Sequence, residues 1–220
     1  MRFNLLTLIT LLAISCSAQV PSALNEAEFN KYWTVESESP DYSVTFTDEY
    51  CQIVSPKGLT LWRNEKLSGD IEIEYDARVM EEGPEDRLSD LNCFWMATDP
   101  RAEDIFVNKD KRSGIFANCA TLQLYYVGYG GNHNSTTRFR RYNGNPGPAI
   151  IKEYKDADHL LKPNHWYHIK LTASQGKVQY NIDGETLVDW EDSQPLTEGW
   201  FGFRTTLSRT QIKNFTYKTL

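Results

Sequence analysis

Residues 71–79 read Ile-Glu-Ile-Glu-Tyr-Asp-Ala-Arg-Val, so apolar and charged side chains alternate along the stretch. Successive side chains of an extended chain point to opposite faces, and the pattern therefore predicts an antiparallel strand with one buried face. The pair Asp183-Gly184 separates two similar stretches and predicts a hairpin, because this pair tolerates the positive φ of a tight turn. Besides residues 71–79, the predicted strands are residues 92–97, 122–129, 136–142, 166–173, 177–182, 185–190, 200–205 and 210–217, and the hairpin joins 177–182 to 185–190.

Many short strands with almost no helix predict an all-β fold, an antiparallel two-sheet β-sandwich of the concanavalin-like jelly-roll type. One short helix is predicted between Ala23 and Trp33, and two stretches, Glu81–Asp90 and Asn143–Lys162, are predicted to be long loops. Residues 19–220 fit a single domain. Six residues that share the inward phase of their strands are predicted to lie in the core: Ile71, Ile73, Tyr75, Ile169, Leu171 and Phe203.

Residues 1–18 have the features of a signal peptide, with a basic start, an apolar run and small residues before the expected cleavage point. Two alternatives stay open, cleavage after Ala18 and lipidation of Cys16. No later stretch reaches the ~20 apolar residues that a membrane-spanning helix needs. We therefore expect a secreted or periplasmic protein, soluble or attached to the cell surface by lipid, without a membrane span and monomeric.

Charge and cysteine content argue against several classes of function. The formal net charge of −7 argues against nucleic-acid binding, which requires a basic surplus to neutralise phosphates. Three cysteines remain after export, so at least one thiol stays free, and we interpret Cys93 and Cys119 as core residues rather than nucleophiles. The sequence predicts no cofactor and no metal motif, although scattered oxygens of a sandwich domain can hold a structural calcium ion.

The most unusual stretch is residues 125–142, in which a glycine-rich polar turn joins two predicted strands. The second strand places four residues on one face: Thr136, Arg138, Arg140 and Tyr142. One interpretation is an exposed hairpin whose arginines pair with the surplus acids. The other is a site for a sugar that bears a carboxylate, because the arginine fork matches carboxylate geometry.

The second interpretation assigns further candidates around the turn. His133 is placed to act as a base, and Asn132 and Asn134 flank it. Three aromatic residues are candidates for stacking on sugar rings: Trp95, Tyr125 and Tyr129. Two other histidines, His165 and His168, lie in a predicted strand and are interpreted as structural.

Residues 94–100, 125–142, 166–169 and 199–206 resemble a concanavalin-like jelly-roll family of polysaccharide-degrading Bacteroidetes. The resemblance covers most of the chain from about residue 42 onward. The nearest functional similarity is to the ulvan oligosaccharide dehydratase of marine flavobacteria, and more broadly to jelly-roll polysaccharide lyases. The resemblance implies a β-eliminase, most simply a dehydratase that removes water from a terminal uronic acid to give the 4,5-unsaturated sugar.

This chemistry implies roles for the residues around the turn. The sugar carboxylate must be neutralised, a base must remove the proton from C5, and an acid must protonate the group that leaves C4. The resemblance implies that Arg138 or Arg140 binds the carboxylate, helped by an asparagine of the turn, while His133 is the base and Tyr142 the acid. Nearby arginines predict a lowered pKa for the Tyr142 phenol, which would allow the last two roles to be reversed.

Other functions stay open at this point. A polysaccharide lyase of the same fold would expel a glycosidic oxygen instead of a hydroxyl group. A non-catalytic carbohydrate-binding sandwich would use the same arginines and aromatic residues without a base or an acid in reach of C5. A lectin-like structural domain of a larger surface complex is a third alternative. The expected partner of the enzyme or the binding domain is an anionic oligosaccharide.

Overall fold

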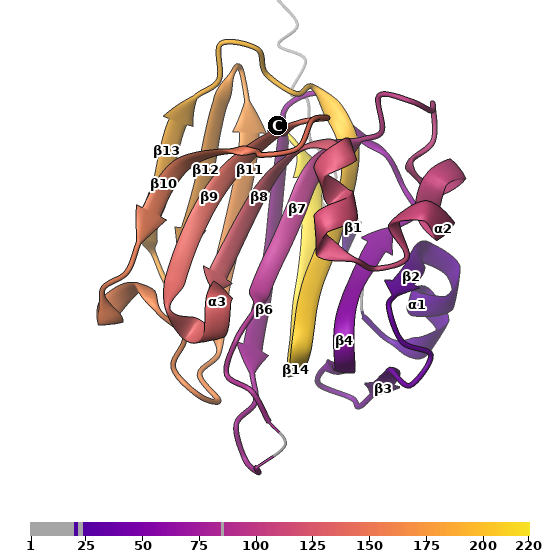
Figure 1. The fold of residues 1–220 in the computed structure, drawn as a ribbon, viewed down its shortest axis with the longest axis vertical. Coiled ribbons are helices and arrows are strands. Elements are labelled where there is room, and N and C mark those ends of the chain that lie inside the picture. Colours follow the sequence, from indigo (N-terminus) through magenta and orange to yellow (C-terminus); the bar gives the residue numbers. More distant parts are fainter. Residues whose placement is uncertain (1–19, 22–23, 85) are drawn as a thin grey trace, which may run out of the picture.

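Two long strands, β4 (Cys51–Arg63) and β14 (Glu198–Thr219), each contribute to both layers of the fold (Figure 1). The computed structural model describes residues 20–21, 24–84 and 86–220. Residues 200–204 pair with β7 (Leu91–Thr98), whereas residues 210–219 pair with β6 (Ile71–Val79). Between these halves Leu207 has a φ of 51° and the register with β4 shifts, so β14 bends here and continues in the other sheet.

Every strand pairing is antiparallel, and the pairings define a front and a back sheet. The front sheet has the order β2 (Trp33–Ser37), β4, β14, β7, β8 (Gln123–Gly130), β9 (Thr136–Asn143), β10 (Ala149–Tyr154). The back sheet has the order β3 (Ser43–Phe46), β4, β14, β6, β11 (Tyr167–Ser174), β12 (Lys177–Ile182), β13 (Glu185–Glu191). Two short strands, β1 (Val20–Pro21) and β5 (Leu67–Ser68), pair with β14.

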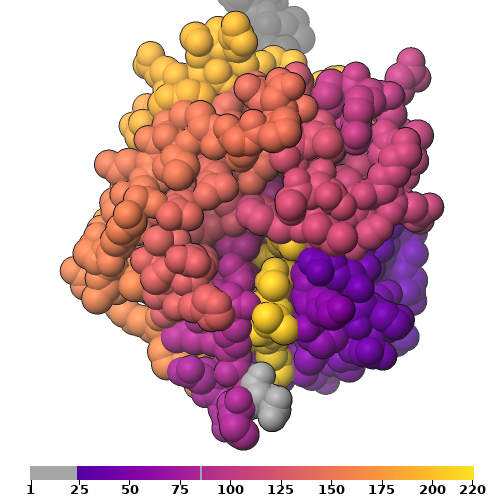
Figure 2. All heavy atoms as spheres, in the orientation of Figure 1, coloured from indigo at the N-terminus to yellow at the C-terminus, as the bar shows by residue number. Residues whose placement is uncertain are grey.

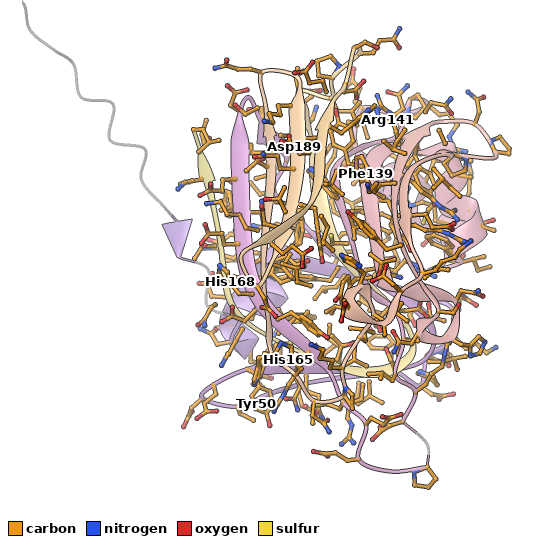
Figure 3. All side chains as sticks on the ribbon, turned by 90° about the vertical axis from the view of Figure 1, so that its left-hand side faces the viewer. Tyr50, Phe139, Arg141, His165, His168 and Asp189 are labelled. Carbon is orange, nitrogen blue, oxygen red and sulfur yellow. The ribbon has the colours of Figure 1, made fainter. Side chains whose placement is uncertain are left out.

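The main core lies between the two sheets. All six residues predicted for the core are buried there, which confirms the inward phase that was assigned to their strands. Figure 3 views the layers edge-on and shows Phe139 between them, with His168 on the outer side of the back sheet. The predicted all-β sandwich is confirmed.

A second, smaller core lies on the outer face of the front sheet. Residues 99–122 leave the sheet after β7 and form three short helical segments, η1 (Ile105–Asn108), α2 (Lys109–Arg112) and η2 (Phe116–Thr121). We call this segment the cap, because its apolar residues pack on the outward side chains of β7, β8 and β9. Arg112 of the cap forms a buried ion pair with Glu36 of β2, and Asp99 accepts hydrogen bonds from Arg101 (2.7 and 2.8 Å) and from Asn108 (3.0 Å). The cap therefore covers part of the front face and leaves the rest open.

Several element boundaries differ from the prediction. The helix α1 runs over Glu26–Tyr32 and is capped by Asn25, whose side chain accepts a hydrogen bond from the Glu28 amide (3.0 Å). The predicted loop 143–162 contains strand β10 and a short helical segment, η3 (Ala157–His159), so this expectation is wrong. The two strands predicted at 200–205 and 210–217 are one bent strand.

Other expectations about local structure are confirmed or lie outside the described residues. The hairpin at Asp183-Gly184 is confirmed, and both residues have positive φ. The predicted signal peptide lies outside the described residues. Within the described part of the chain, no helix is long and apolar enough to cross a membrane.

Candidate functional site

A cavity of about 300 Å³ lies on the outer face of the front sheet, beside the cap. Figure 2 shows a hollow on this face, with atoms of β14 (yellow) visible between the front strands and the indigo N-terminal residues. Strands β7, β8, β9 and β14 form its floor, and the cap, the loop after β2 and the turn α3 (Gly131–Asn134) form its walls. Its lining residues are Glu38, Asp90, Asn92, Phe116, Tyr126, Gly128, Gly131, Asn132, Thr136, Arg138, Arg140, Arg204 and Thr206.

One row of residues in register crosses the four strands of the floor and continues to β4. Arg138 of β9 pairs with Gly128 of β8, which pairs with Asn92 of β7. Asn92 pairs with Arg204 of β14, which pairs with Thr60 of β4. Residues in register on neighbouring strands project to the same face of a sheet. The antiparallel register therefore brings together residues that are far apart in the sequence.

Arg204 places a buried positive charge at one end of this row. Its side chain is 1% exposed, and its guanidinium donates hydrogen bonds to two neutral acceptors, Thr60 Oγ1 (3.0 Å) and Gly114 O (2.7 Å). Among the described residues, the carboxylate nearest to it is Glu38, whose Oε1 lies 3.9 Å from Nη2. A side chain at position 58 would displace both this guanidinium and Glu38, since a Cβ built on Gly58 collides with Glu38 Oε1 and lies 2.6 Å from Arg204 Nη2. Glu38 offsets this buried charge only from 3.9 Å and is itself 29% exposed, so this end of the cavity can also accept an anion.

Arg138 and Arg140 place two more cations on β9, as the period of two predicted. Arg138 donates from Nε to Glu153 of β10 at 2.5 Å. Arg140 forms no ion pair with any carboxylate of the described residues, and its Nε is buried without a hydrogen-bond partner. The sequence analysis placed Asn132, His133, Arg138, Arg140 and Tyr142 around one site, and only Asn132, Arg138 and Arg140 of these line the cavity.

Neutral groups of the cavity suit a sugar rather than a simple anion. Asn92 is 6% exposed, and its Oδ1 has no partner among the described residues, so it can accept a hydrogen bond from a hydroxyl group. Phe116 of the cap supplies a partly exposed aromatic wall, 5.3 Å from the Tyr126 ring between centroids. The Tyr126 hydroxyl lies over Gly128, because a Cβ at that position would collide with it. Burial raises the pKa of Tyr126 well above its usual value, so the phenol stays protonated.

The two residues predicted to transfer protons do not line the cavity. His133 is exposed on the turn α3, next to Asn132, which does line it. Tyr142 is only 2% exposed and packs in the smaller core beneath the cap. The expected fall in its pKa is wrong, because burial outweighs the effect of Arg140 and raises the pKa to about 12.

The three aromatic residues predicted to stack on sugar rings face the opposite side of the front sheet. Trp95 and Tyr125 are 0% exposed and Tyr129 is 3% exposed, and all three belong to the main core. The Tyr125 hydroxyl donates a hydrogen bond to Asp192 (2.8 Å). Because these rings are buried between the sheets, the stacking role assigned to them is wrong, and Phe116 and Tyr126 are the aromatic residues at the cavity.

The other candidates from the sequence have structural contacts. Asn134 exchanges two hydrogen bonds with the backbone of Leu161 (2.8 and 2.9 Å), so its amide group is already used. His165 contacts Asp183 (2.9 Å) and His168 contacts Asp76 (2.8 Å), both away from the cavity. Cys93 and Cys119 are buried free thiols, as predicted, and burial raises the pKa of each, to about 12 and about 11. No cluster of three or more ligating side chains that could hold a metal ion is found among the described residues.

Sequence reasoning did not identify several residues that line the cavity: Glu38, Asp90, Asn92, Phe116, Tyr126, Arg204 and Thr206. One signal was available, because Arg204 follows Trp-Phe-Gly-Phe in an apolar strand, where a charge is costly unless it is paired or has a function. The others depend on which strands become neighbours and on how the cap folds, and a single sequence does not contain that information.

Comparison with solved structures supports the same fold. The chain is similar to a protein of unknown function with a galectin-like fold from Bacillus subtilis, with 19% identity, a TM-score of 0.72, and coverage of 92% of this chain and 98% of that one. It is also similar to the carbohydrate-binding module CBM66 from Bacillus subtilis, with 17% identity, a TM-score of 0.58, and coverage of 85% and 95%. A third similar structure is the exoplasmic/lumenal domain of VIP36 in its Ca²⁺/Man3GlcNAc-bound form, with 12% identity, a TM-score of 0.63, and coverage of 90% and 88%.

These similarities confirm the jelly-roll part of the resemblance seen in the sequence, whereas the link to ulvan stays a prediction. No curated protein sequence matches the chain significantly. Residues 53–215 match a family that is described as a domain of unknown function, DUF6250. Because the match spans more than half of the 220 residues, the chain belongs to the DUF6250 family.

Proposed function

We propose that this protein is a carbohydrate-binding domain that holds an acidic saccharide in the front-sheet cavity. The observation that carries the proposal is the buried guanidinium of Arg204, which lines the cavity and has its nearest carboxylate 3.9 Å away. Arg140, without an ion pair among the described residues, adds a second cation in a protein whose net charge is −7. Cations retained on an acidic body attract an anionic ligand, and the arginine fork fits its carboxylate.

The remaining lining supports a sugar as the bearer of that carboxylate. Hydroxyl groups of a sugar can donate to Asn92 Oδ1 and to Asp90, and the apolar face of a ring can pack on Phe116. The VIP36 domain and the CBM66 module, which are similar in fold, are described as mannoside-bound and carbohydrate-binding respectively. The cavity volume of about 300 Å³ is at the lower end of the range for small-ligand sites, so it suits a few sugar rings.

Calorimetric titration with trigalacturonic acid and with maltotriose as the uncharged control tests the proposal. We expect the uronide to bind, the neutral sugar to bind at least tenfold more weakly, and the uronide affinity to fall as salt is added. Arg140→Gln should weaken uronide binding by ~10–100-fold, since hydrogen bonds to charged groups contribute ~1.5–3 kcal/mol.

A matched control for Arg140→Gln is Lys177→Gln, which removes an exposed cation from the back sheet. Its uronide affinity should stay within twofold of wild type. Equal affinity for the uronide and the neutral sugar, or equal losses in the two variants, would contradict the proposal.

The eliminase is a second candidate, and one observation favours it. Tyr126 holds a protonated phenol in the cavity with the arginines, so it is a better placed acid than Tyr142. Incubation with uronide oligosaccharides tests this function through the ultraviolet absorbance of the unsaturated product together with its mass. Loss of water at constant chain length indicates a dehydratase, and shorter products indicate a lyase. Tyr126→Phe should then abolish turnover. Binding without either product would support the binding domain and contradict the eliminase.

A further inference from the structure

We infer that the cavity recognises an acidic oligosaccharide with charged groups on two different sugars, separated by at least one sugar, rather than a single uronic acid. The inference rests on the proposed function and adds to it the length and charge spacing of the ligand. It is carried by the positions of the cations along the cross-strand row and by the side chains that lie between them.

The strand order sets the distance between the two ends of the row. Arg138 on β9 and Arg204 on β14 are in register with each other through Gly128 and Asn92, so three strand spacings separate them. Neighbouring strands lie ~4.8 Å apart, which puts the two Cα atoms ~14 Å apart. Arg140 lies two residues from Arg138 on the same strand and belongs to the same end.

The hydrogen bonds of both side chains direct them away from each other. Arg138 donates to Glu153 on β10, which is the neighbour of β9 on the side away from β8. Arg204 donates to Thr60 on β4, which is the neighbour of β14 on the side away from β7, and to Gly114 O of the cap. The two guanidinium groups are therefore farther apart than their Cα atoms, and one carboxylate cannot contact both.

The floor between the two ends carries no cation and suits hydroxyl groups. Gly128 has no side chain, and the Tyr126 hydroxyl lies over it, while Asn92 Oδ1 lacks a partner among the described residues. The carboxylate of Asp90 also lines the cavity, paired with Arg87 at 3.1 Å. Hydroxyl groups of a sugar in the middle of the ligand can donate hydrogen bonds to this carboxylate.

The charged groups near the Arg204 end complete the sequence of charges along the cavity. Glu38 lies beyond Arg204, with its Oε1 3.9 Å from Nη2. The cavity thus presents cations at Arg138 and Arg140, acceptors in the middle, a cation at Arg204 and an acid behind it. A chain with acidic groups on the sugars at its two ends matches this order, and a single charged ring does not.

A length series on the wild-type protein tests the inference without any variant. Titration with mono-, di-, tri- and tetragalacturonic acid should show an increase in affinity of at least tenfold, and this increase should appear at the trimer or tetramer. The dimer serves as the critical comparison, because it already carries two charges but holds them on adjacent sugars. A neutral series of the same lengths, from glucose to maltotetraose, should show no comparable step.

A double variant locates the second charged group. Arg138→Gln combined with Arg140→Gln should remove the step, so that the tetramer binds no more than twofold better than the monomer, while the monomer still binds at Arg204. The inference is overturned if the monomer binds as tightly as the tetramer, if the step appears at the dimer, if the neutral series shows the same step, or if the folded double variant keeps it. If no uronide of any length binds, the proposed function fails as well.

Discussion

Gly128→Ala is the smallest change that tests how the cavity floor is built. Gly128 lies in β8 and has no positive φ, so alanine is compatible with its backbone. The new methyl group would lie 2.9 Å from Tyr126 Cζ and closer still to its hydroxyl. Carbon atoms pack best ~3.5–4.0 Å apart, so the Tyr126 ring has to move by roughly 1 Å.

Movement of that ring costs stability and distorts the cavity. Tyr126 packs against Phe94, Phe116 and Tyr142, with ring centroids 5.3–6.0 Å away, so it has little room within the smaller core. Overpacking of this kind costs ~1–3 kcal/mol. Because the hydroxyl lies between the arginines at the two ends, we also expect uronide affinity to fall by at least tenfold, although no charged group has been changed.

Denaturant unfolding and calorimetric titration measure these two effects. Gly83→Ala is the matched control, since a Cβ there meets no atom within 4 Å and its φ is not positive. Tyr126→Phe removes the hydroxyl group that collides first, so Gly128→Ala should cost less free energy of unfolding in that background than in the wild type. If Gly128→Ala leaves both the midpoint of unfolding and the uronide affinity at wild-type values, Tyr126 does not hold the position that the proposal requires.

Two further predictions concern the attachment of the cap. Arg112→Ala leaves the buried Glu36 without its partner and should cost ~3–5 kcal/mol in denaturant unfolding, whereas replacing both residues together with apolar ones should cost less. Burial alone raises the pKa of Asp99, but hydrogen bonds from Arg101 and Asn108 outweigh it and lower the pKa to about 2. A carboxyl group whose pKa is lowered by folding stabilises the protein above its unfolded pKa of 3.8 and loses this effect as the pH falls towards 2. Unfolding curves should therefore show a loss of ~1–2 kcal/mol of stability over this window, less than the full shift implies because Arg101 is 44% exposed. Asp99→Asn should remove this pH dependence.

The alternation of side chains was sufficient to predict the sandwich and one face of β9. Along residues 136–142 the period of two places Arg138 and Arg140 on one face and Phe139 on the other, where its neighbours in phase are Thr137 and Arg141. In β8 the alternation cannot tell the inner face from the outer one, because the strand reads Gln-Leu-Tyr-Tyr-Val-Gly-Tyr-Gly and is largely apolar on both faces. The outer face of β8 is apolar because the cap covers part of it. The cap consists of short helical turns, which no periodic pattern in the sequence predicts.

This ambiguity explains the error over the aromatic residues. Tyr125 and Tyr129 were assigned to ligand binding, yet they face the main core. Tyr126 points to the opposite face of β8 and lines the cavity. Arg204 could not be placed at the site because it lies 66 residues beyond Arg138 and reaches the same row only through the pairing of β14 with β7. Local patterns therefore define strands and faces, whereas the site depends on strand order.

The passage of β4 and β14 through both sheets affects how the chain must fold. Neither layer can acquire its central strand until residues 198–219 are in place, and these residues pair with β4, near the other end of the chain. Pairings between such distant segments close large loops before they gain stabilising contacts, and chains dominated by them fold slowly. Because both layers depend on the same two strands, we expect them to form and to melt together, in a single cooperative transition that includes the cavity.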